Sequence, residues 1–258
     1  MKICVLIKQV PDGDSPIRIG GDSVSIHEDG ITYTTNESDG YALEEALLLK
    51  EAHGGEVVVC SLGAEGAVQV VKDGLAKGAD RAIFISDEKL NDLDPMSISR
   101  VFAAVLKDEN FDLILSGLQS DDTGNAQTGV MLAELLNTSH ASMVVGTELL
   151  NEKTIKVKRE LENGWFQWTE LDFPASLTIQ SGLNKPRYAS LRGIMMMKKK
   201  PIQTLTAADI EATDLEPLIS IRKLYIPQKT KETTFISGTP DEIVTQLIDQ
   251  LENEIKIL

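Results

Sequence analysis

A polar loop between a predicted strand and a predicted helix has the residue types best suited to ligand chemistry. The loop spans residues 117–129 and has the sequence GLQSDDTGNAQTG. Its three glycines let the backbone approach a ligand closely. Gln127 and Thr128 stand where the helix begins, so backbone N–H groups, the helix dipole and a hydroxyl can converge on a phosphate. The loop indicates an anion or nucleotide site, and the alternative is an ordinary polar connection with a helix N-cap. No Gly-Lys-Ser/Thr follows, so it is not a P-loop, nor is it the dinucleotide fingerprint.

Two further turns follow predicted strands or precede predicted helices. Residues 36–39 read Asn-Glu-Ser-Asp, and either Ser38 or Asp39 caps the following helix or the turn binds an adenine or ribose. Ser61-Leu62-Gly63 ends another predicted strand. In a parallel sheet, ligands bind in the crevice beyond the carboxyl ends of the strands, so the three turns are expected to line one crevice.

The elements that would position these turns alternate along the first half of the chain. Continuous apolar runs, typical of parallel strands covered on both faces, occupy residues 3–7, 57–61, 81–85 and 111–116. Helical patterns occupy residues 41–53, 64–77, 95–107 and 130–136. The order strand, helix, strand predicts an α/β fold with a doubly wound, mostly parallel sheet and right-handed crossovers.

The second half of the chain has a different pattern. Residues 154–161 and 165–171 alternate around Asn163-Gly164, which predicts a β-hairpin, and a third strand-like run covers residues 175–180. Residues 181–201 are basic and rich in methionine and show no periodicity. A short helix near residues 207–210, an extended stretch around Pro227 and a final helix at residues 240–254 complete the prediction. The expected division is an α/β domain (1–183, with the hairpin at 154–171), a loop (184–200) and a C-terminal arm (201–258), which is expected to pack on the main domain or a partner.

Composition and charge exclude several classes of protein. The 258 residues are 42% hydrophobic and carry a net charge of -15, which argues against nonspecific nucleic-acid binding through phosphate neutralisation. The two cysteines, Cys4 and Cys60, each lie in an apolar run, which argues against a disulfide framework or a zinc cluster. No apolar run reaches 18 residues and the N-terminus reads as a first strand, so a cytoplasmic protein is expected.

Catalytic patterns are missing from the sequence. The three histidines, His27, His53 and His140, are scattered, no pair has metal-ligand spacing, and no Gly-x-Ser-x-Gly occurs. Glu160 follows Lys158-Arg159 on a predicted strand and reads as part of a solvated charge row. Met195 to Met197 lie near Leu191 in the non-periodic segment, and methionines of this kind suit a surface that adapts to partners. The sequence therefore predicts neither a metal site nor a catalytic residue.

Taken together, these motifs resemble the β subunit of electron-transfer flavoprotein over essentially the whole chain. The resemblance is carried by Lys8-Gln9-Val10, Asn36 with residues 42–46, residues 76–81, the loop 117–129, Lys158-Arg159-Glu160 and Asn184-Lys185-Pro186-Arg187-Tyr188-Ala189-Ser190-Leu191. Residues 180–194, with Tyr225-Ile226-Pro227 later, look most like the form that serves trimethylamine dehydrogenase and related amine dehydrogenases. The resemblance implies an electron-carrier subunit, not an enzyme in its own right.

The resemblance implies that this chain binds AMP as a structural nucleotide, whereas FAD is held mainly by the α subunit of a heterodimer. The implied AMP contacts are Leu6 through its backbone, Asn36, Glu37, Ser38, Asp39, Ser61, Leu62, Gly63, Gly117, Ser120, Asp121, Asp122, Thr123, Gly124, Asn125, Ala126, Gln127 and Thr128.

The resemblance also implies two protein contacts. Leu191 would be the anchor that enters a pocket on a flavoprotein dehydrogenase, with Arg187, Tyr188, Ile194 and Met195 around it. Glu160 would meet an arginine of the flavin-binding domain of the α subunit, on which the C-terminal arm would pack. Two other interpretations stay open. One is a subunit of an electron-bifurcating NADH-dependent flavoprotein with a second FAD in place of AMP, and the other is a nucleotide-sensing module on a similar fold.

Overall fold

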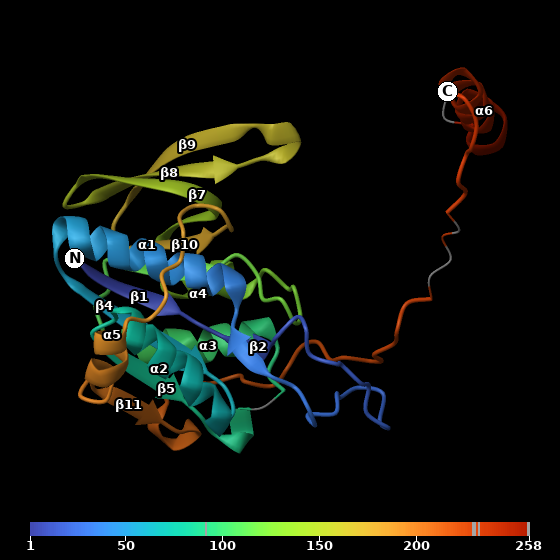
Figure 1. The fold of residues 1–258 in the computed structure, drawn as a ribbon. Coiled ribbons are helices and arrows are strands. Elements are labelled where there is room, and N and C mark those ends of the chain that lie inside the picture. The colour runs from blue at the N-terminus through green and yellow to red at the C-terminus, as the bar shows by residue number, and fades with distance from the viewer. Residues whose placement is uncertain (91, 229–230, 232, 257–258) are drawn as a thin grey trace.

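The computed structural model describes residues 1–90, 92–228, 231 and 233–256. Over these residues, nine strands form one central sheet (Figure 1). In chain order they are β1 (Lys2–Leu6), β4 (Glu56–Leu62), β5 (Arg81–Ile85), β6 (Leu113–Gly117), β7 (Ser139–Asn151), β8 (Thr154–Glu160), β9 (Phe166–Asp172), β10 (Ala175–Ile179) and β11 (Ile202–Leu205). A separate antiparallel pair consists of β2 (Gln9–Pro11) and β3 (Tyr33–Thr35).

Within the described part of the chain, the central sheet runs in the order β11-β5-β4-β1-β6-β10-β7-β8-β9. The strands from β11 to β7 pair in parallel, and β8 and β9 add the antiparallel hairpin. The chain builds outward from β1 through β4 to β5 and then crosses back to place β6 on the other side of β1. The topological switch point therefore lies between β1 and β6, where ligand crevices of open α/β sheets form.

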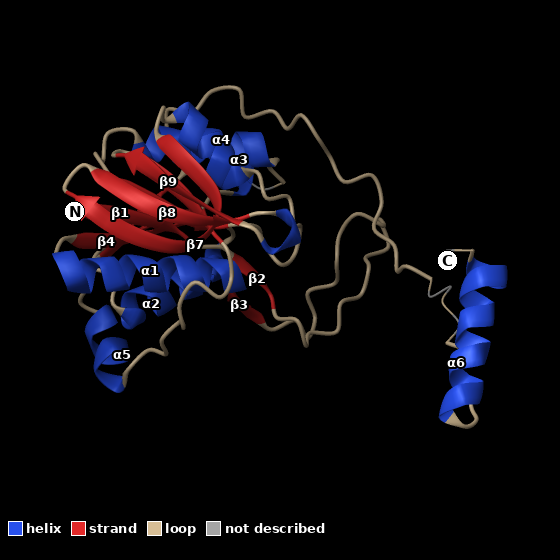
Figure 2. Ribbon diagram, turned by 90° about the horizontal axis from the view of Figure 1, so that it is seen from above, coloured by secondary structure: helices blue, strands red, loops and turns tan. Residues whose placement is uncertain are grey.

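Helices cover both faces of this sheet. The covering helices are α1 (Glu37–His53), α2 (Val68–Lys77), α3 (Pro95–Leu106) and α4 (Thr128–Leu135). Helix α5 (Leu191–Met197) packs on α2, and α6 (Pro240–Asp249) lies apart from the sheet. Short 3-10 turns lie at Glu65–Ala67, Glu88–Leu90, Glu162–Gly164 and Ala207–Asp209, and a π-helical turn lies at Gln250–Ile255. Figure 2 shows α1 and α2 on one face and α3 and α4 on the other, as a doubly wound α/β fold requires.

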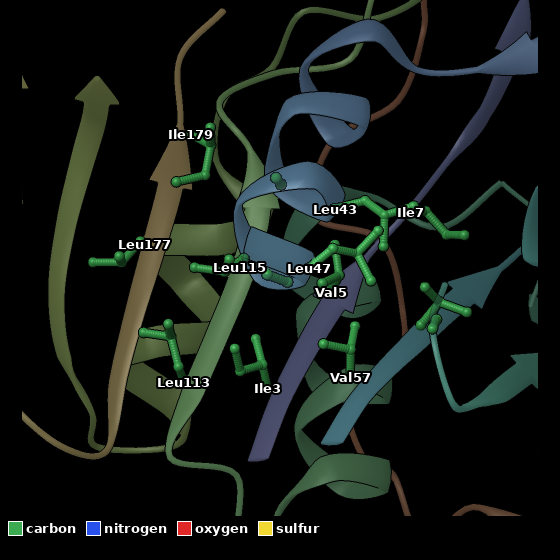
Figure 3. Packing of buried hydrophobic residues seen from close by; sticks show 14 of the residues in the cluster. Ile3, Val5, Ile7, Leu43, Leu47, Val57, Leu113, Leu115, Leu177 and Ile179 are labelled. Carbon is green, nitrogen blue, oxygen red and sulfur yellow. The ribbon is translucent and has the colours of Figure 1, made fainter. Parts of the chain in front are cut away.

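The central strands are apolar on both faces because each face lies beneath helices. Ile3 and Val5 point into the cluster under α1 and α2, where Leu43 and Leu47 pack on them (Figure 3). Cys4 and Leu6 point to the other face of the sheet, where they belong to a second cluster with side chains of α3 and α4. Both cysteines are free and buried, as the apolar runs around them predicted.

The four predicted strands of the first half are confirmed, with ends within two residues of the prediction. The hairpin is also confirmed: Asn163 and Gly164 both have positive φ between β8 and β9. Helix α1 begins four residues earlier than predicted, and its N-cap is Asn36. The prediction that Ser38 or Asp39 caps this helix is therefore wrong, because both residues lie inside its first turn.

Five strands and helices of the described residues have no counterpart in the sequence-based prediction, and two of them are β2 and β3, which form the separate antiparallel pair. Strand β7 completes the parallel part of the sheet, β11 pairs with β5, and α5 lies within the segment expected to lack regular structure. Because β11 comes after residue 201, the beginning of the predicted C-terminal arm belongs to the central sheet. The predicted final helix is confirmed as α6 and the π-helical turn that continues it.

The C-terminal arm follows the main domain and then leaves it. Leu215 packs on the α3–α4 cluster, the Leu218 amide donates to Asp94 (2.8 Å), and the Leu224 amide donates to the Ser23 carbonyl (2.7 Å). Helix α6 has no buried residue and stands away from the sheet in both views (Figures 1 and 2). Within the described residues, no helix has the length and apolar character required to cross a membrane.

Candidate functional site

A cavity of about 330 Å³ opens at the carboxyl ends of β1, β4 and β6, beside the topological switch point. Its volume lies within the range of small-molecule sites. Polar side chains from the turn before α1 and from the loop before α4 form one side, and Leu90, Leu93, Ile98 and Phe102 form an apolar side. A ligand with a flat apolar part and a polar or charged part suits such a lining.

The structure brings most of the predicted nucleotide contacts to this cavity. Those that line it are Leu6, Asn36, Asp39, Leu62, Gly63, Gly117, Ser120, Thr123, Asn125, Ala126, Gln127 and Thr128. Glu37, Ser38, Ser61, Asp121, Asp122 and Gly124 lie in the same turns but are not part of its lining. Three sequence segments that are far apart in the chain therefore meet at one crevice.

Asn36 joins the first of these segments to the second. Its buried side chain donates from Nδ2 to the Gln119 carbonyl (2.9 Å) and to Ser38 Oγ (3.0 Å), and its Oδ1 accepts from the Asp121 amide (2.9 Å). Ser38 Oγ also donates to the Gln119 carbonyl (2.7 Å). A buried amide with all these partners fixes the loop relative to the N-terminus of α1.

Asp39 spans the switch point itself. One carboxylate oxygen accepts from the Lys8 amide at the end of β1 (2.8 Å), and the other accepts from the Gly117 amide at the end of β6 (2.9 Å). Burial raises the pKa of Asp39 to about 7, although these amides and the charge of Lys8 act in the opposite direction. The first turn of α1 thereby holds two strand ends at a fixed separation beside the cavity.

The Lys8 side chain binds the loop of residues 117–129. Its Nζ lies 2.7 Å from both carboxylate oxygens of Asp122 and 3.3 Å from Ser120 Oγ, which in turn lies 2.9 Å from Thr123 Oγ1. Burial alone would raise the pKa of Asp122, but the bonds from Lys8 and Ser120 hold it below its usual value. Lys8 therefore offsets the charge of Asp122, one of the two carboxylates of the loop.

Two glycines allow the close packing around the cavity. A Cβ at Gly117 would overlap Ser38 Oγ and the Asp39 carboxylate and would lie 2.8 Å from the Asp39 amide nitrogen. A Cβ at Gly129, in the first turn of α4, would overlap Ser116 Oγ and lie 2.6 Å from Thr178 Cγ2. The two helices can approach the end of β6 only because neither position carries a side chain.

The N-terminus of α4 offers hydrogen-bond donors toward the cavity. Its N-cap, Gln127, makes no side-chain cap bond, and Ala126 before it has a positive φ. Ser116 Oγ, at the end of β6 in the cavity wall, is buried and lacks a hydrogen-bond partner within the described residues. An unpartnered buried hydroxyl beside an uncapped helix N-terminus is the arrangement expected where a polar ligand supplies the missing acceptor.

Some lining residues were not identified from the sequence. Lys8 and Ser116 stand at the ends of predicted strands, and that position was the signal that could have found them. The apolar residues gave no such signal, because Leu90 belongs to a short turn and Phe102 to a helix whose patterns are those of any core element.

The residues predicted to contact protein partners lie elsewhere on the molecule. Tyr188, Leu191, Ile194 and Met195 are exposed on and before α5, and Leu191 is 83% exposed. Arg187 is instead held by carboxylates of α1. Glu160 lies at the end of β8, half-buried, and accepts from Gln180 Nε2 (3.4 Å).

Fold and site define a doubly wound α/β protein with a small-molecule crevice at the switch point of its sheet. The family model of the electron transfer flavoprotein domain matches residues 23–210. Proteins named electron transfer flavoprotein subunit beta from Methylophilus methylotrophus and Bacillus subtilis are 39% and 35% identical to the chain, covering 99% and 100% of both sequences respectively. A mitochondrial subunit beta from Arabidopsis thaliana is 35% identical over the full length of both.

The chain belongs to the electron transfer flavoprotein family, as a β subunit. Its function is electron transfer, and a β subunit implies an α subunit as its partner.

Proposed function

We propose that this β subunit binds AMP in the cavity at the switch point and pairs with an α subunit that holds most of an FAD. The heterodimer accepts electrons from flavoprotein dehydrogenases, of the amine-oxidising class, and passes them to a downstream acceptor. The observation that carries the nucleotide assignment is the meeting of residues 36–39, 62–63 and 117–129 at one cavity. In this proposal the chain binds AMP and positions its protein partners for electron transfer, and it does not convert a substrate of its own.

The cavity lining fits a nucleoside monophosphate. The uncapped N-terminus of α4, with Gln127 and Thr128, suits a phosphate, and Ser116 Oγ lacks a partner there. The apolar side with Leu93 and Phe102 suits a purine, which needs a flat apolar surface. Gly117 and Gly129 leave the backbone free of side chains at the end of β6.

The flavin belongs to the proposed heterodimer as a whole. FAD, when bound, supplies one-electron and hydride chemistry, and the protein supplies its binding and orientation. On this chain, Glu160 at the end of β8 offers a carboxylate to an arginine of the α subunit. Helix α6 carries exposed Val244, Leu247 and Ile248 and suits packing on the same partner.

Cofactor content tests the nucleotide assignment. The chain is co-expressed with its α partner, the purified heterodimer is denatured, and released FAD and AMP are quantified by chromatography. One FAD and one AMP per heterodimer are expected. Two FAD without AMP would identify the electron-bifurcating type, and nucleotide on this chain alone without flavin would favour a sensor.

The docking assignment has its own test. In Leu191→Ala, electron transfer from the dehydrogenase is expected to fall by at least about tenfold, because truncating a central interface anchor costs 2 kcal/mol or more. FAD and AMP content should stay as in wild type. Leu135→Ala on α4, where the leucine is 43% exposed, is the matched control and should leave the rate unchanged. An unchanged rate in Leu191→Ala would remove the anchor assignment.

A further inference from the structure

The segment that carries Leu191 is attached to the main domain on both sides of its exposed residues. On the N-terminal side, Arg187 Nε and its amide donate to Glu44 Oε2 (2.9 and 3.0 Å), and Nη2 donates to Glu44 Oε1 (3.0 Å). The same guanidinium donates to Glu51, about two turns further along α1 (2.5 and 3.2 Å). A fork that holds two carboxylates of one helix fixes the position of the chain at residue 187.

The burial of the Glu44 carboxylate is compensated by its bonds to Arg187. The Glu44 side chain is only 7% exposed, and a buried carboxylate is costly unless it is paired and hydrogen-bonded. The neighbouring Glu45 is also buried; it accepts from Asn184 Nδ2 (3.0 Å) and from the Thr147 hydroxyl. Asn184 also donates to the Tyr41 carbonyl (3.1 Å). Helix α1 thus holds the segment at residues 184 and 187.

The other end of the segment is attached to α2. Lys200 Nζ donates to the carbonyls of Leu75 (2.9 Å) and Ala79 (2.5 Å) at the C-terminal end of that helix. A cation there satisfies carbonyls that have no partner within the helix and matches the helix dipole. Between the two attachments, α5 lies so close to α2 that a Cβ at Gly193 would overlap the Ala76 carbonyl.

Several apolar side chains between the two attachments are exposed, although Met197 at the end of α5 packs on the core cluster. Tyr188 is 95% exposed, Leu191 83% and Met195 67%. Apolar side chains on a free segment would fold back onto the surface and hide from water. Here polar contacts, rather than the burial of these side chains, hold the segment in place.

We propose that Arg187, through Glu44 and Glu51, is a positioning residue that preforms the docking surface of Tyr188, Leu191 and Met195 before a partner arrives. This inference rests on the proposed docking by Leu191. It changes the expectation for Arg187, which the sequence grouped with the residues that touch the dehydrogenase. The partner then meets a docking surface that is already ordered. Arg187 contributes by reducing the conformational entropy that the segment would otherwise lose on docking.

The charge-matched control is available on α5 itself. Arg192 is exposed and makes no ion pair within the described residues, so Arg192→Gln removes the same charge from the surface without touching the attachment. Arg187→Gln removes the fork, and Arg187→Lys keeps the charge but cannot bridge both carboxylates in the same way. All variants are made in the heterodimer.

Two measurements test the proposal. Hydrogen exchange of the amides in residues 188–197 is expected to speed up about tenfold in Arg187→Gln, less in Arg187→Lys, and not in Arg192→Gln. The KM for the heterodimer in electron transfer from the dehydrogenase is expected to rise about tenfold in Arg187→Gln with kcat and cofactor content unchanged. Unchanged exchange in Arg187→Gln overturns the proposal. Equal KM increases in Arg187→Gln and Arg192→Gln also overturn it, because Arg187 would then act only through its charge on the surface and not by holding the segment.

The outcome is separable from that of the docking proposal. If Leu191→Ala leaves electron transfer unchanged, docking by this surface fails, whereas the exchange measurement still reports whether Arg187 holds the segment. If Leu191→Ala uncouples the dehydrogenase but Arg187→Gln changes neither exchange nor KM, docking stands and the positioning proposal fails.

Discussion

Replacing Asn36 by alanine tests most directly whether the two polar loops act as one nucleotide site. The side chain is 1% exposed and makes three hydrogen bonds that join the N-terminus of α1 to the loop after β6. Asn36→Ala leaves the backbone bonds of the turn in place, including that from the Asn36 amide to the Lys8 carbonyl (2.9 Å). The helix should therefore persist while the loop loses its main attachment.

The expected cost follows from which groups lose their partners. The Gln119 carbonyl keeps its bond from Ser38 Oγ at 2.7 Å, so the Asp121 amide is the donor left without a partner. Because Asp121 is exposed, water can replace the lost protein acceptor, so the expected cost is that of the three lost bonds, about 0.5–1.5 kcal/mol each. Ordering the loosened loop around AMP is expected to use about 1.4 kcal/mol of the binding free energy, and the AMP affinity therefore falls about tenfold.

The assay is isothermal titration of AMP into nucleotide-free heterodimer, together with AMP content after purification. Ser38→Ala is the graded control, because it removes a bond to the same Gln119 carbonyl but leaves Asn36 bound to both Gln119 and Asp121. Its loss of affinity should be smaller than that of Asn36→Ala. The double variant should lose more than the sum of the two, because only it removes both side-chain donors from the Gln119 carbonyl. An Asn36→Ala heterodimer that binds AMP within twofold of wild type would refute the reasoning.

Two more predictions concern the same end of the sheet. Gly117→Ala should lower the free energy of unfolding of the heterodimer by about 1–3 kcal/mol and reduce its AMP content, because the new Cβ overpacks against Asp39. The control Gly40→Ala adds a Cβ in open space in the first turn of α1 and should be neutral or stabilising. Equal urea midpoints for the two variants would contradict this prediction. Burial raises the pKa of Asp39 from its ordinary value of 3.8 to about 7 in the folded protein. Between these two pH values the folded state therefore binds a proton that the unfolded state has released. The resulting contribution to the free energy of unfolding is complete below pH 3.8 and is lost as the pH rises through 7. Urea midpoints at pH 5 and pH 8 should therefore show Asp39→Asn, which also gives up one backbone acceptor, to be less destabilising relative to wild type at pH 8 than at pH 5, and the opposite trend would contradict this reasoning.

The parallel sheet and the crevice were predictable because their signals are local. The strands predicted at residues 57–61 and 111–116 are continuous apolar runs, and turns with glycine and short polar residues follow them. Once a doubly wound order is assumed, the rule for strand ends places residues 36–39 and 117–129 together without further information. The prediction for the segments was therefore sound even though the cap of α1 was assigned to the wrong residue.

The elements that were missed depend on contacts between distant segments. Helix α5 has a glycine in its interior and no periodicity, and it is held by the Ser190 cap (Gly193 N to Ser190 Oγ, 3.0 Å) and by α2. Strand β7 begins with polar residues and contains Met143 with a positive φ, so neither alternation nor an apolar run marks it. Lys8 finds its partners more than a hundred residues away, in the loop after β6. No window of sequence contains such information.

Helix α1 connects the two proposed sites of the molecule. Its N-terminus holds the loops of the cavity through Asn36 and Asp39, and its middle and last turns hold the docking segment through Glu44 and Glu51. A helix of this length spans about 25 Å and is stiff because its apolar face, including Leu43 and Leu47, packs on β1 and β6. The distance between nucleotide and docking surface is therefore fixed by one buried element. If AMP binds as proposed, a nucleotide without redox chemistry would contribute to electron transfer by ordering the loops at the N-terminal end of α1, from which that distance is set.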